Sequence, residues 1–253
     1  MGGRRHSAGP VVSALAGVLA VISAAAPALA AEPDECATPP ELMEGGTPLP
    51  HLAARLKAHQ PATIVAIGGA STIGQAAGSP DLSFPHQLEQ ILSNDYQKGS
   101  ITVVNKGVPR QSARQNLERF PTDVFAEDPV MVIWETGIND AVRGTDVDEF
   151  AETLQTGVDQ LKNRAIDIVM VDMQFSKSAT ALINFEAYLK ALHRVGDLAE
   201  VYVLPRYAMM RYWSEQKVFN FDEVAAEDRA KLAARVYDCI AYKLAQVVRR
   251  AVP

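Results

Sequence analysis

The sequence predicts a three-layer α/β/α domain built around a central five-stranded parallel sheet. Short runs that are apolar throughout and rich in β-branched residues alternate with longer stretches of helical periodicity, as in successive βαβ units. These runs show no polar alternation, which is typical of strands buried on both faces of a parallel sheet. A chain of 253 residues that is 48% hydrophobic can bury one substantial core. We therefore expect a single α/β domain.

Each expected element follows from this alternation, in chain order. We expect strands at Thr63–Ile67, Ile101–Val104, Val130–Trp134, Ile166–Val171 and Val201–Leu204. We expect helices at about residues 50–59, 84–96, 111–120, 147–164, 181–196, 206–217 and 226–249. Right-handed crossovers place the helices on both faces of the sheet. Ligands bind such folds at the loops that follow the carboxyl ends of the strands, so a functional site is expected there.

Residues 1–30 have the pattern of a secretory signal peptide. Arg4 and Arg5 form a positive n-region, residues 11–22 form an apolar run, and residues 28–30 give a small-x-small cleavage motif. An uncleaved anchor is the alternative, because a run of about twenty residues can span a bilayer. The alanine and serine content and the cleavage motif favour removal. We expect an exported protein, periplasmic or secreted, with no stable membrane span after cleavage.

The mature chain is expected to begin with an extended leader at residues 31–49, rich in Pro, Glu, Gly and Thr, before one domain at residues 50–253. The two cysteines are Cys36 in the leader and Cys239 in the last predicted helix. In an oxidising compartment the simplest interpretation is a disulfide between them, and two unpaired buried thiols are the alternative. Neither cysteine belongs to a Cys/His cluster, so no metal site and no cofactor are predicted.

The charge of the chain excludes some classes of partner. The net charge is −6 and no long run of lysine or arginine occurs. Nucleic acid and anionic membrane surfaces are therefore not expected partners. The sequence gives no indication of the oligomeric state.

Glycine-containing motifs close the first three predicted strands. They are Gly68–Gly74 (Gly-Gly-Ala-Ser-Thr-Ile-Gly), Asn105–Gly107 (Asn-Lys-Gly) and Gly137–Asp140 (Gly-Ile-Asn-Asp). In this order, each at a strand end, they resemble the first three blocks of the SGNH (GDSL-like) hydrolases. The resemblance extends from about residue 62 to the C-terminus and implies a flavodoxin-like order of elements and a relation to ester hydrolases.

The resemblance also implies an oxyanion hole. In this family a serine in the first turn attacks an ester carbonyl, and backbone N–H groups and an asparagine amide bind the developing oxyanion. The matching donors are the backbone of Ala70, the backbone of Gly107 and the side chain of Asn139. The alternative roles are a glycine required only by its turn and an amide that caps a loop.

The nucleophile of the family does not carry over. The family pattern is Gly-Asp-Ser-x-Thr-x-Gly, and Thr72 and Gly74 take their family places when the motif starts at Gly68. This register puts Ala70 in the serine slot. A register shifted by one residue would put Ser71 there but would lose both later matches, so we favour Ala70.

The catalytic histidine is also replaced. An exported bacterial subgroup of the family ends in Asp-x-x-His, with a tyrosine six residues further on and a cysteine two beyond that. Tyr237 and Cys239 fit this ending, which puts Asp228 in the aspartate slot and Lys231 in the histidine slot. A desolvated lysine can act as a base, so a dyad of Ser71 and Lys231 is conceivable. A solvated or Asp228-paired Lys231 is the favoured interpretation.

The resemblance with these two departures predicts an SGNH-like pseudoenzyme of the cell envelope, related to acyl-ester or carbohydrate O-acyl esterases. It would bind an acyl- or carbohydrate-type ligand or act as an accessory protein. Arg110, Gln174 and Arg206 follow strand ends and are candidates to line the pocket. One alternative is an active serine hydrolase, a carbohydrate O-deacetylase or short-acyl esterase that uses Ser71. Another is a structural or interaction protein that binds no ligand.

Overall fold

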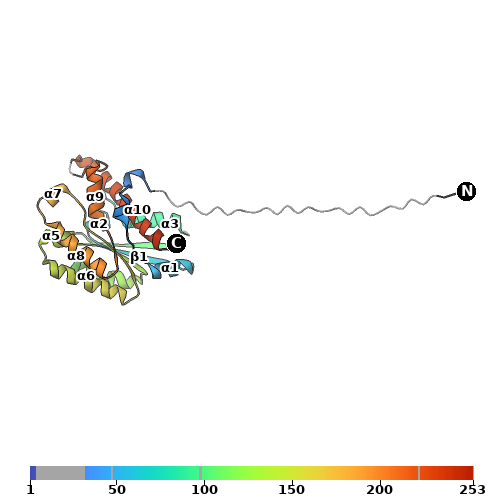
Figure 1. The fold of residues 1–253 in the computed structure, drawn as a ribbon, viewed down its shortest axis with the longest axis horizontal. Helices are drawn as coiled ribbons and strands as arrows, with labels where there is room; N and C mark the ends of the chain where they lie inside the picture. Colours follow the sequence, from blue (N-terminus) through green and yellow to red (C-terminus); the bar gives the residue numbers. More distant parts are fainter. Residues whose placement is uncertain (4–31, 47, 97–98, 222, 253) are drawn as a thin grey trace.

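A central sheet of five parallel strands organises the computed structural model, which describes residues 1–3, 32–46, 48–96, 99–221 and 223–252 (Figure 1). The strands are β1 (Ala62–Gly68), β2 (Ile101–Gly107), β3 (Met131–Glu135), β4 (Asp167–Val171) and β5 (Tyr202–Leu204). Their order across the sheet is β2-β1-β3-β4-β5. All five predicted strands are confirmed, each within a few residues of its expected bounds.

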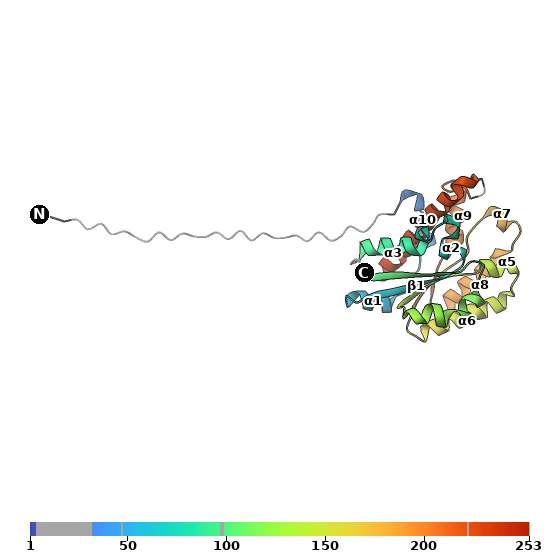
Figure 2. The same cartoon turned by 180° about the vertical axis from the view of Figure 1, so that it is seen from behind.

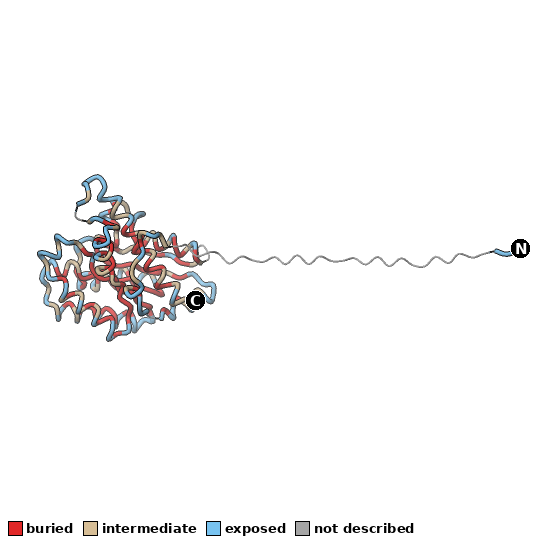
Figure 3. Tube along the Cα trace, turned by 45° about the horizontal axis from the view of Figure 1, so that its top comes forward, coloured by how far each residue is buried: buried red, intermediate tan, exposed pale blue. Residues whose placement is uncertain are grey.

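Helices cover both faces of the sheet (Figures 1 and 2). Those that match predicted helices are α1 (Pro50–Lys57), α3 (Phe84–Asp95), α4 (Ala113–Glu118), α6 (Val147–Lys162), α8 (Phe185–Leu198), α9 (Arg206–Glu215) and α10 (Arg229–Ala251). Helices α3 and α10 share one buried cluster with the sheet, and α6 and α8 share the other. Buried residues run through the sheet and the inner helix faces, while exposed residues lie on the periphery (Figure 3). The predicted three-layer fold is confirmed.

Three short helices were not expected. They are α2 (Ala70–Ile73), α5 (Ile138–Arg143) and α7 (Lys177–Thr180). Helices of four to six residues are too short to show an amphipathic period in a sequence. The helix expected at 111–120 instead starts at Ala113 and passes at Phe120 into a π-helical turn that ends at Val124. Proline at residue 121 lacks the N–H that an α-helix would need at this point.

The sheet register brings the ends of β1 and β2 together. Gly68 pairs with Gly107, and α2 begins two residues after Gly68. A Cβ on Gly68 would lie 2.3 Å from Thr72 Oγ1, and a Cβ on Gly107 would lie 2.3 Å from the backbone nitrogen of Ile73. Both positions therefore require glycine, because α2 packs directly on the strand ends.

The leader packs along α10. Cys36 and Cys239 form the predicted disulfide, and both residues are fully buried. Trp213 Nε1 donates a hydrogen bond to the carbonyl oxygen of Ala37 at 3.0 Å. Residues 4–31, which hold all but the first three residues of the predicted signal peptide, lie outside the described residues. In the described part of the chain, no helix combines the length and the hydropathy that crossing a bilayer requires.

Candidate functional site at the turn after β1

A buried glutamate holds the turn between β1 and α2. Glu135 ends β3 and is 3% exposed. Its Oε2 accepts hydrogen bonds from the backbone N–H of Gly69 at 3.0 Å and from Thr72 Oγ1 at 2.9 Å. Charge-assisted hydrogen bonds of this kind are stronger than neutral ones, so one carboxylate fixes both ends of the turn.

The hydroxyl group of Ser71 points into a polar cluster whose members are buried except for Gln174, which is exposed. Ser71 Oγ donates to Gln174 Oε1 at 3.2 Å and accepts from Arg206 Nη2 at 2.9 Å. Arg206 is 1% exposed, and its Nη1 lies 3.5 Å from Glu135 Oε1. We call Ser71, Glu135, Gln174, Arg206 and Tyr237 the Ser71 cluster. Its members come from α2, β3, the β4–α7 loop, α9 and α10.

Tyr237 closes this cluster from α10. Burial raises the pKa of its phenol above the ordinary value of 10.0, while the charge of Arg206 and a hydrogen bond with Ser71 act to lower it. The phenol is therefore protonated at neutral pH. Among the described residues, neither a histidine nor a lysine hydrogen-bonds to the Ser71 hydroxyl. The cluster holds the hydroxyl in place and offers it no imidazole or amine base.

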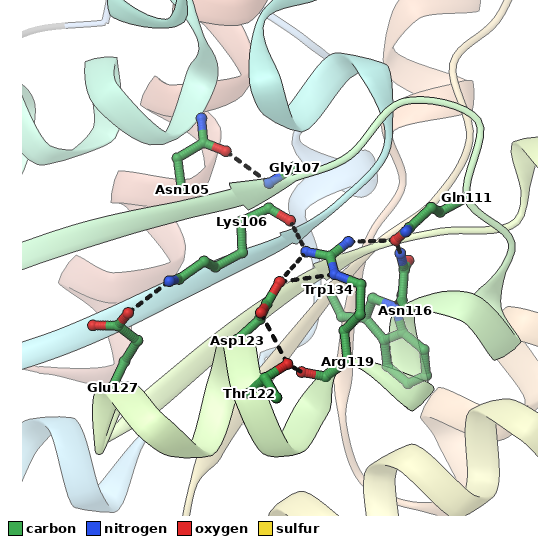
Figure 4. A network of polar contacts seen from close by, with 10 residues as sticks. All are labelled: Asn105, Lys106, Gly107, Gln111, Asn116, Arg119, Thr122, Asp123, Glu127 and Trp134. Carbon is green, nitrogen blue, oxygen red and sulfur yellow. Dashed lines mark hydrogen bonds and ion pairs between the residues drawn. The ribbon is translucent and has the colours of Figure 1, made fainter.

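Two of the three expected oxyanion donors, Gly107 and Asn139, have partners within the protein. The backbone N–H of Gly107 donates to Asn105 Oδ1 at 2.9 Å (Figure 4). Asn139 Nδ2 donates to the carbonyl oxygen of Gln111 at 3.0 Å. A Cβ built on Gly69 would lie 3.6 Å from Asn139 Nδ2, so Asn139 lies beside the turn as the motif order predicts. An amide nitrogen carries two hydrogens, which leaves Asn139 a second donor for a ligand.

A polar network supports the loop after β2 (Figure 4). Gln111 Oε1 accepts hydrogen bonds from Asn116 Nδ2 at 3.0 Å and from the Arg119 guanidinium. Trp134 Nε1 donates to Asn116 Oδ1 at 3.2 Å, which links the network to β3. Because Gln111 also accepts from Asn139, the network fixes the position of that side chain.

The remaining predicted site residues lie elsewhere. Asp228 precedes α10 and Lys231 lies in its first turn, and both are exposed. Among the described residues, no hydrogen bond or ion pair joins Lys231 to Ser71, so the structure does not form the conceivable dyad. Arg110 is exposed and has a left-handed φ of 65°. Gln174 and Arg206, which were expected to line the pocket, instead hydrogen-bond to the Ser71 hydroxyl and to each other.

Sequence reasoning missed the role of Glu135. A carboxylate that closes the apolar run Met131–Trp134 was the available indication, since a charged residue at the end of a buried strand needs a partner. The partner, Arg206, is 71 residues away in the sequence. In the described part of the chain, no group of three or more His, Cys, Asp or Glu residues is arranged to hold a metal ion.

Solved structures with the same fold include several esterases. A putative lipolytic protein of the G-D-S-L family from Desulfitobacterium hafniense has a TM-score of 0.58 and 20% identity, covering 73% of this chain and 98% of that chain. A variant of the acetylxylan esterase Axe2 from Geobacillus stearothermophilus has a TM-score of 0.61 and 19% identity, covering 74% of this chain and 94% of that chain. A two-domain esterase active on acetylated mannans has a TM-score of 0.64 and 19% identity, covering 82% of this chain and 56% of that chain.

At these identities the structural likeness shows the fold alone. Among curated protein sequences, no relative matches the chain. The model of the non-GDSL lipase-like family matches residues 35–253, which is most of the chain. The protein therefore belongs to the non-GDSL lipase-like family.

Proposed function

We propose that this protein is an exported, esterase-like binding protein of the cell envelope that does not hydrolyse esters through a serine. One observation carries the proposal. Residue 70, in the family's serine slot, is alanine, and the neighbouring Ser71 hydroxyl is hydrogen-bonded to the exposed Gln174 side chain and to the buried Arg206 guanidinium.

The contacts of Ser71 do not suit a nucleophile. Attack on an ester requires a base that takes the hydroxyl proton. The Ser71 proton points at the side-chain oxygen of Gln174, and a neutral amide is not a base at neutral pH. One of the two lone pairs on Ser71 Oγ accepts from the Arg206 guanidinium, and the Tyr237 phenol also hydrogen-bonds to this hydroxyl, so the oxygen is poorly placed to attack a carbonyl carbon.

The ligand class follows from what stays accessible near the turn. Ala70 and Asn139 are partly exposed, and Arg110 is exposed. The Asn139 amide can donate to a carbonyl or hydroxyl oxygen, and Arg110 can bind an acyl or sugar oxygen. Structural neighbours act on acetylated xylan and acetylated mannans. An acetylated oligosaccharide is therefore the ligand we propose. The buried disulfide supports an extracytoplasmic location.

The first experiment measures hydrolysis of p-nitrophenyl acetate and release of acetate from acetylated xylan. It compares the mature wild-type protein with Ser71→Ala and Ala70→Ser. We expect the wild type and Ser71→Ala to give the same background rate. Turnover that Ser71→Ala abolishes would refute the proposal and establish an active hydrolase. If Ala70 occupies the serine slot, Ala70→Ser with Lys231→His should gain activity over the wild type.

The second experiment measures binding of acetylated xylo-oligosaccharides by calorimetry. We expect Asn139→Ala and Arg110→Ala to weaken binding by about tenfold each, the loss of one good hydrogen bond to a ligand. Arg55→Ala is the matched control, because α1 precedes β1 and lies at the opposite, amino-terminal edge of the sheet. Equal binding by all three variants would show that the ligand does not lie at this turn.

A further inference from the structure

A groove lies at the β5 edge of the sheet and extends to the start of β4, away from the Ser71 cluster. It has a volume of about 890 Å³ and shares no lining residue with that cluster. The leader, including Glu41 and Glu44, lines one part of it, and α8, including Gly196 and Asp197, lines another. Strand β5 lies between them at the edge of the sheet. We call this feature the β5 groove.

One residue of β5, the buried Val203, directs its backbone groups toward the outer edge of the sheet, while the N–H of Val201 is bonded to the carbonyl oxygen of Gly196. The N–H of Asp172 donates to the carbonyl oxygen of Leu204, so Leu204 directs its backbone groups toward β4. Backbone groups of a parallel strand alternate in direction, and Val203 therefore directs its N–H and C=O away from β4. In the described part of the chain, no strand pairs with this edge of β5.

Helix α8 packs closely against the same strand. A Cβ on Gly196 would lie 2.5 Å from Val203 Cγ2 and 2.9 Å from the carbonyl oxygen of Val201. Any larger residue at this position would push α8 away from β5. Glycine thus sets the depth of the groove beside the outward-facing residue of the strand.

The walls of the groove carry mostly negative charge. Glu41 and Glu44 are exposed on the leader, and among the described residues neither carboxylate has a hydrogen bond or ion pair. Asp197 is exposed on α8. The one lysine of the lining, Lys162, donates its ammonium group to the carbonyl oxygen of Ala199. The lining therefore carries five acidic side chains, those of Glu41, Glu44, Asp167, Asp197 and Glu200, against one lysine and two histidines.

An ion pair between the partly exposed His193 and the buried Asp172 closes the end of the groove near α9. His193 Nε2 lies 2.9 Å from Asp172 Oδ2, and Asp172 is 1% exposed. Asp172 Oδ1 also accepts the backbone N–H of Tyr207 at 2.7 Å. These bonds fix the His193 ring in place, so this end of the groove is formed before any partner binds.

We propose that the β5 groove binds an extended, lysine- or arginine-rich segment of a partner protein, which adds beside β5 as a further strand. Backbone hydrogen bonds to an exposed strand edge supply affinity, and side-chain pockets and charges select the sequence. The carboxylates of Glu41, Glu44 and Asp197 select cations. A second copy of this chain, with its net charge of −6, would bring like charges together at the same place.

The test uses a fluorescein-labelled ten-residue peptide of alternating lysine and valine, followed by anisotropy with the full mature protein. A peptide of alternating glutamate and valine is the control for charge. A lysine–valine peptide that is N-methylated at alternate residues, made in both registers, removes backbone donors and leaves the protein unchanged. We expect the protein to bind the lysine–valine peptide and not the glutamate–valine peptide, with an affinity that falls as the salt concentration rises. One of the two N-methylated peptides should bind at least about fivefold more weakly than the unmethylated lysine–valine peptide.

The protein variants locate the site. Glu41→Gln with Glu44→Gln should weaken binding of the lysine peptide by at least about fivefold at low salt. Glu118→Gln with Glu152→Gln removes the same charge from exposed positions outside the groove and should change binding less than about twofold.

Three outcomes would overturn the proposal. Equal losses in the two double variants would show attraction to net charge alone. Unchanged binding by both N-methylated peptides would exclude strand addition. A dimer of the peptide-free protein in sedimentation equilibrium, dissociated by Val203→Pro but not by the control double variant, would make a second copy the occupant.

Discussion

Removal of the disulfide between Cys36 and Cys239 should lower the free energy of unfolding by about 5 kcal/mol. The bridge joins residues 203 positions apart, so its main effect is to restrict the unfolded chain. In the chain-entropy model, closing a loop of about 200 residues lowers the entropy of the unfolded chain by about 18 cal/mol/K, which stabilises the folded state by about 5 kcal/mol at 25 °C. This is a large share of the 5–15 kcal/mol that is typical of a domain.

Packing contributes a smaller part. Both cysteines are fully buried, so replacement by alanine also removes some apolar contact. The leader retains other contacts in such a variant. Trp213 still donates to Ala37, and the Arg235 guanidinium still pairs with Glu35. Exposed ion pairs add at most about 1 kcal/mol, so these contacts cannot replace the cross-link.

The measurement is unfolding in guanidinium chloride, followed by tryptophan fluorescence. Trp213 lies under the leader and Trp134 in the core on the other face of the sheet, so the two indoles report on both parts. With a slope of about 4 kcal/mol per molar, the midpoint for Cys36→Ala with Cys239→Ala should fall by about 1 M. The midpoint for the single Cys239→Ala variant should fall almost as far, because one substitution already removes the cross-link. A midpoint shift below about 0.2 M in the double variant would refute the entropic argument.

Two further predictions concern ion pairs, one fully buried and one with a partly exposed histidine. Glu135→Gln should lower the free energy of unfolding by about 3–5 kcal/mol, because the Arg206 guanidinium would stay buried without its carboxylate. Adding Arg206→Met should recover part of this loss. A double variant that is less stable than Glu135→Gln alone would contradict the pairing. The pKa of His193 is raised above 6.5, chiefly by its hydrogen bond with Asp172, so the pair's contribution to stability is complete below the unfolded pKa and is lost as pH rises through the folded pKa. Unfolding of the wild type and His193→Gln should therefore differ more at pH 5.5 than at pH 9, and an NMR titration of the His193 ring with a midpoint at or below 6.5 would exclude the effect.

The fold could be predicted from the sequence because its strands carry a strong local pattern. Residues of β3 and β4 are buried along their whole length, and their apolar, β-branched runs show this without tertiary information. Helices α6 and α10 are long enough for their periodicity to appear. Helices α2, α5 and α7 have only four to six residues, and a segment of this length is too short to show helical periodicity in the sequence.

The site could be predicted only in part. Strand-end motifs meet because parallel strands end at one edge of a sheet, and Asn139 accordingly lies beside Gly69. The direction of the Ser71 side chain depends on Gln174 and Arg206, which are 103 and 135 residues further along the chain. Pairings at such separations have no local pattern in one sequence.

The glycines of the first two motifs explain why those motifs predict the fold better than the activity. Gly68 and Gly107 lack side chains because α2 lies against both strand ends, where a Cβ on either glycine would come within 2.3 Å of the nearest atom. This packing constraint holds whether residue 70 is serine or alanine. Glu135 likewise fixes the turn through backbone and hydroxyl donors that no catalytic step requires. Packing alone therefore accounts for both glycines and for the turn, whatever the activity of the site.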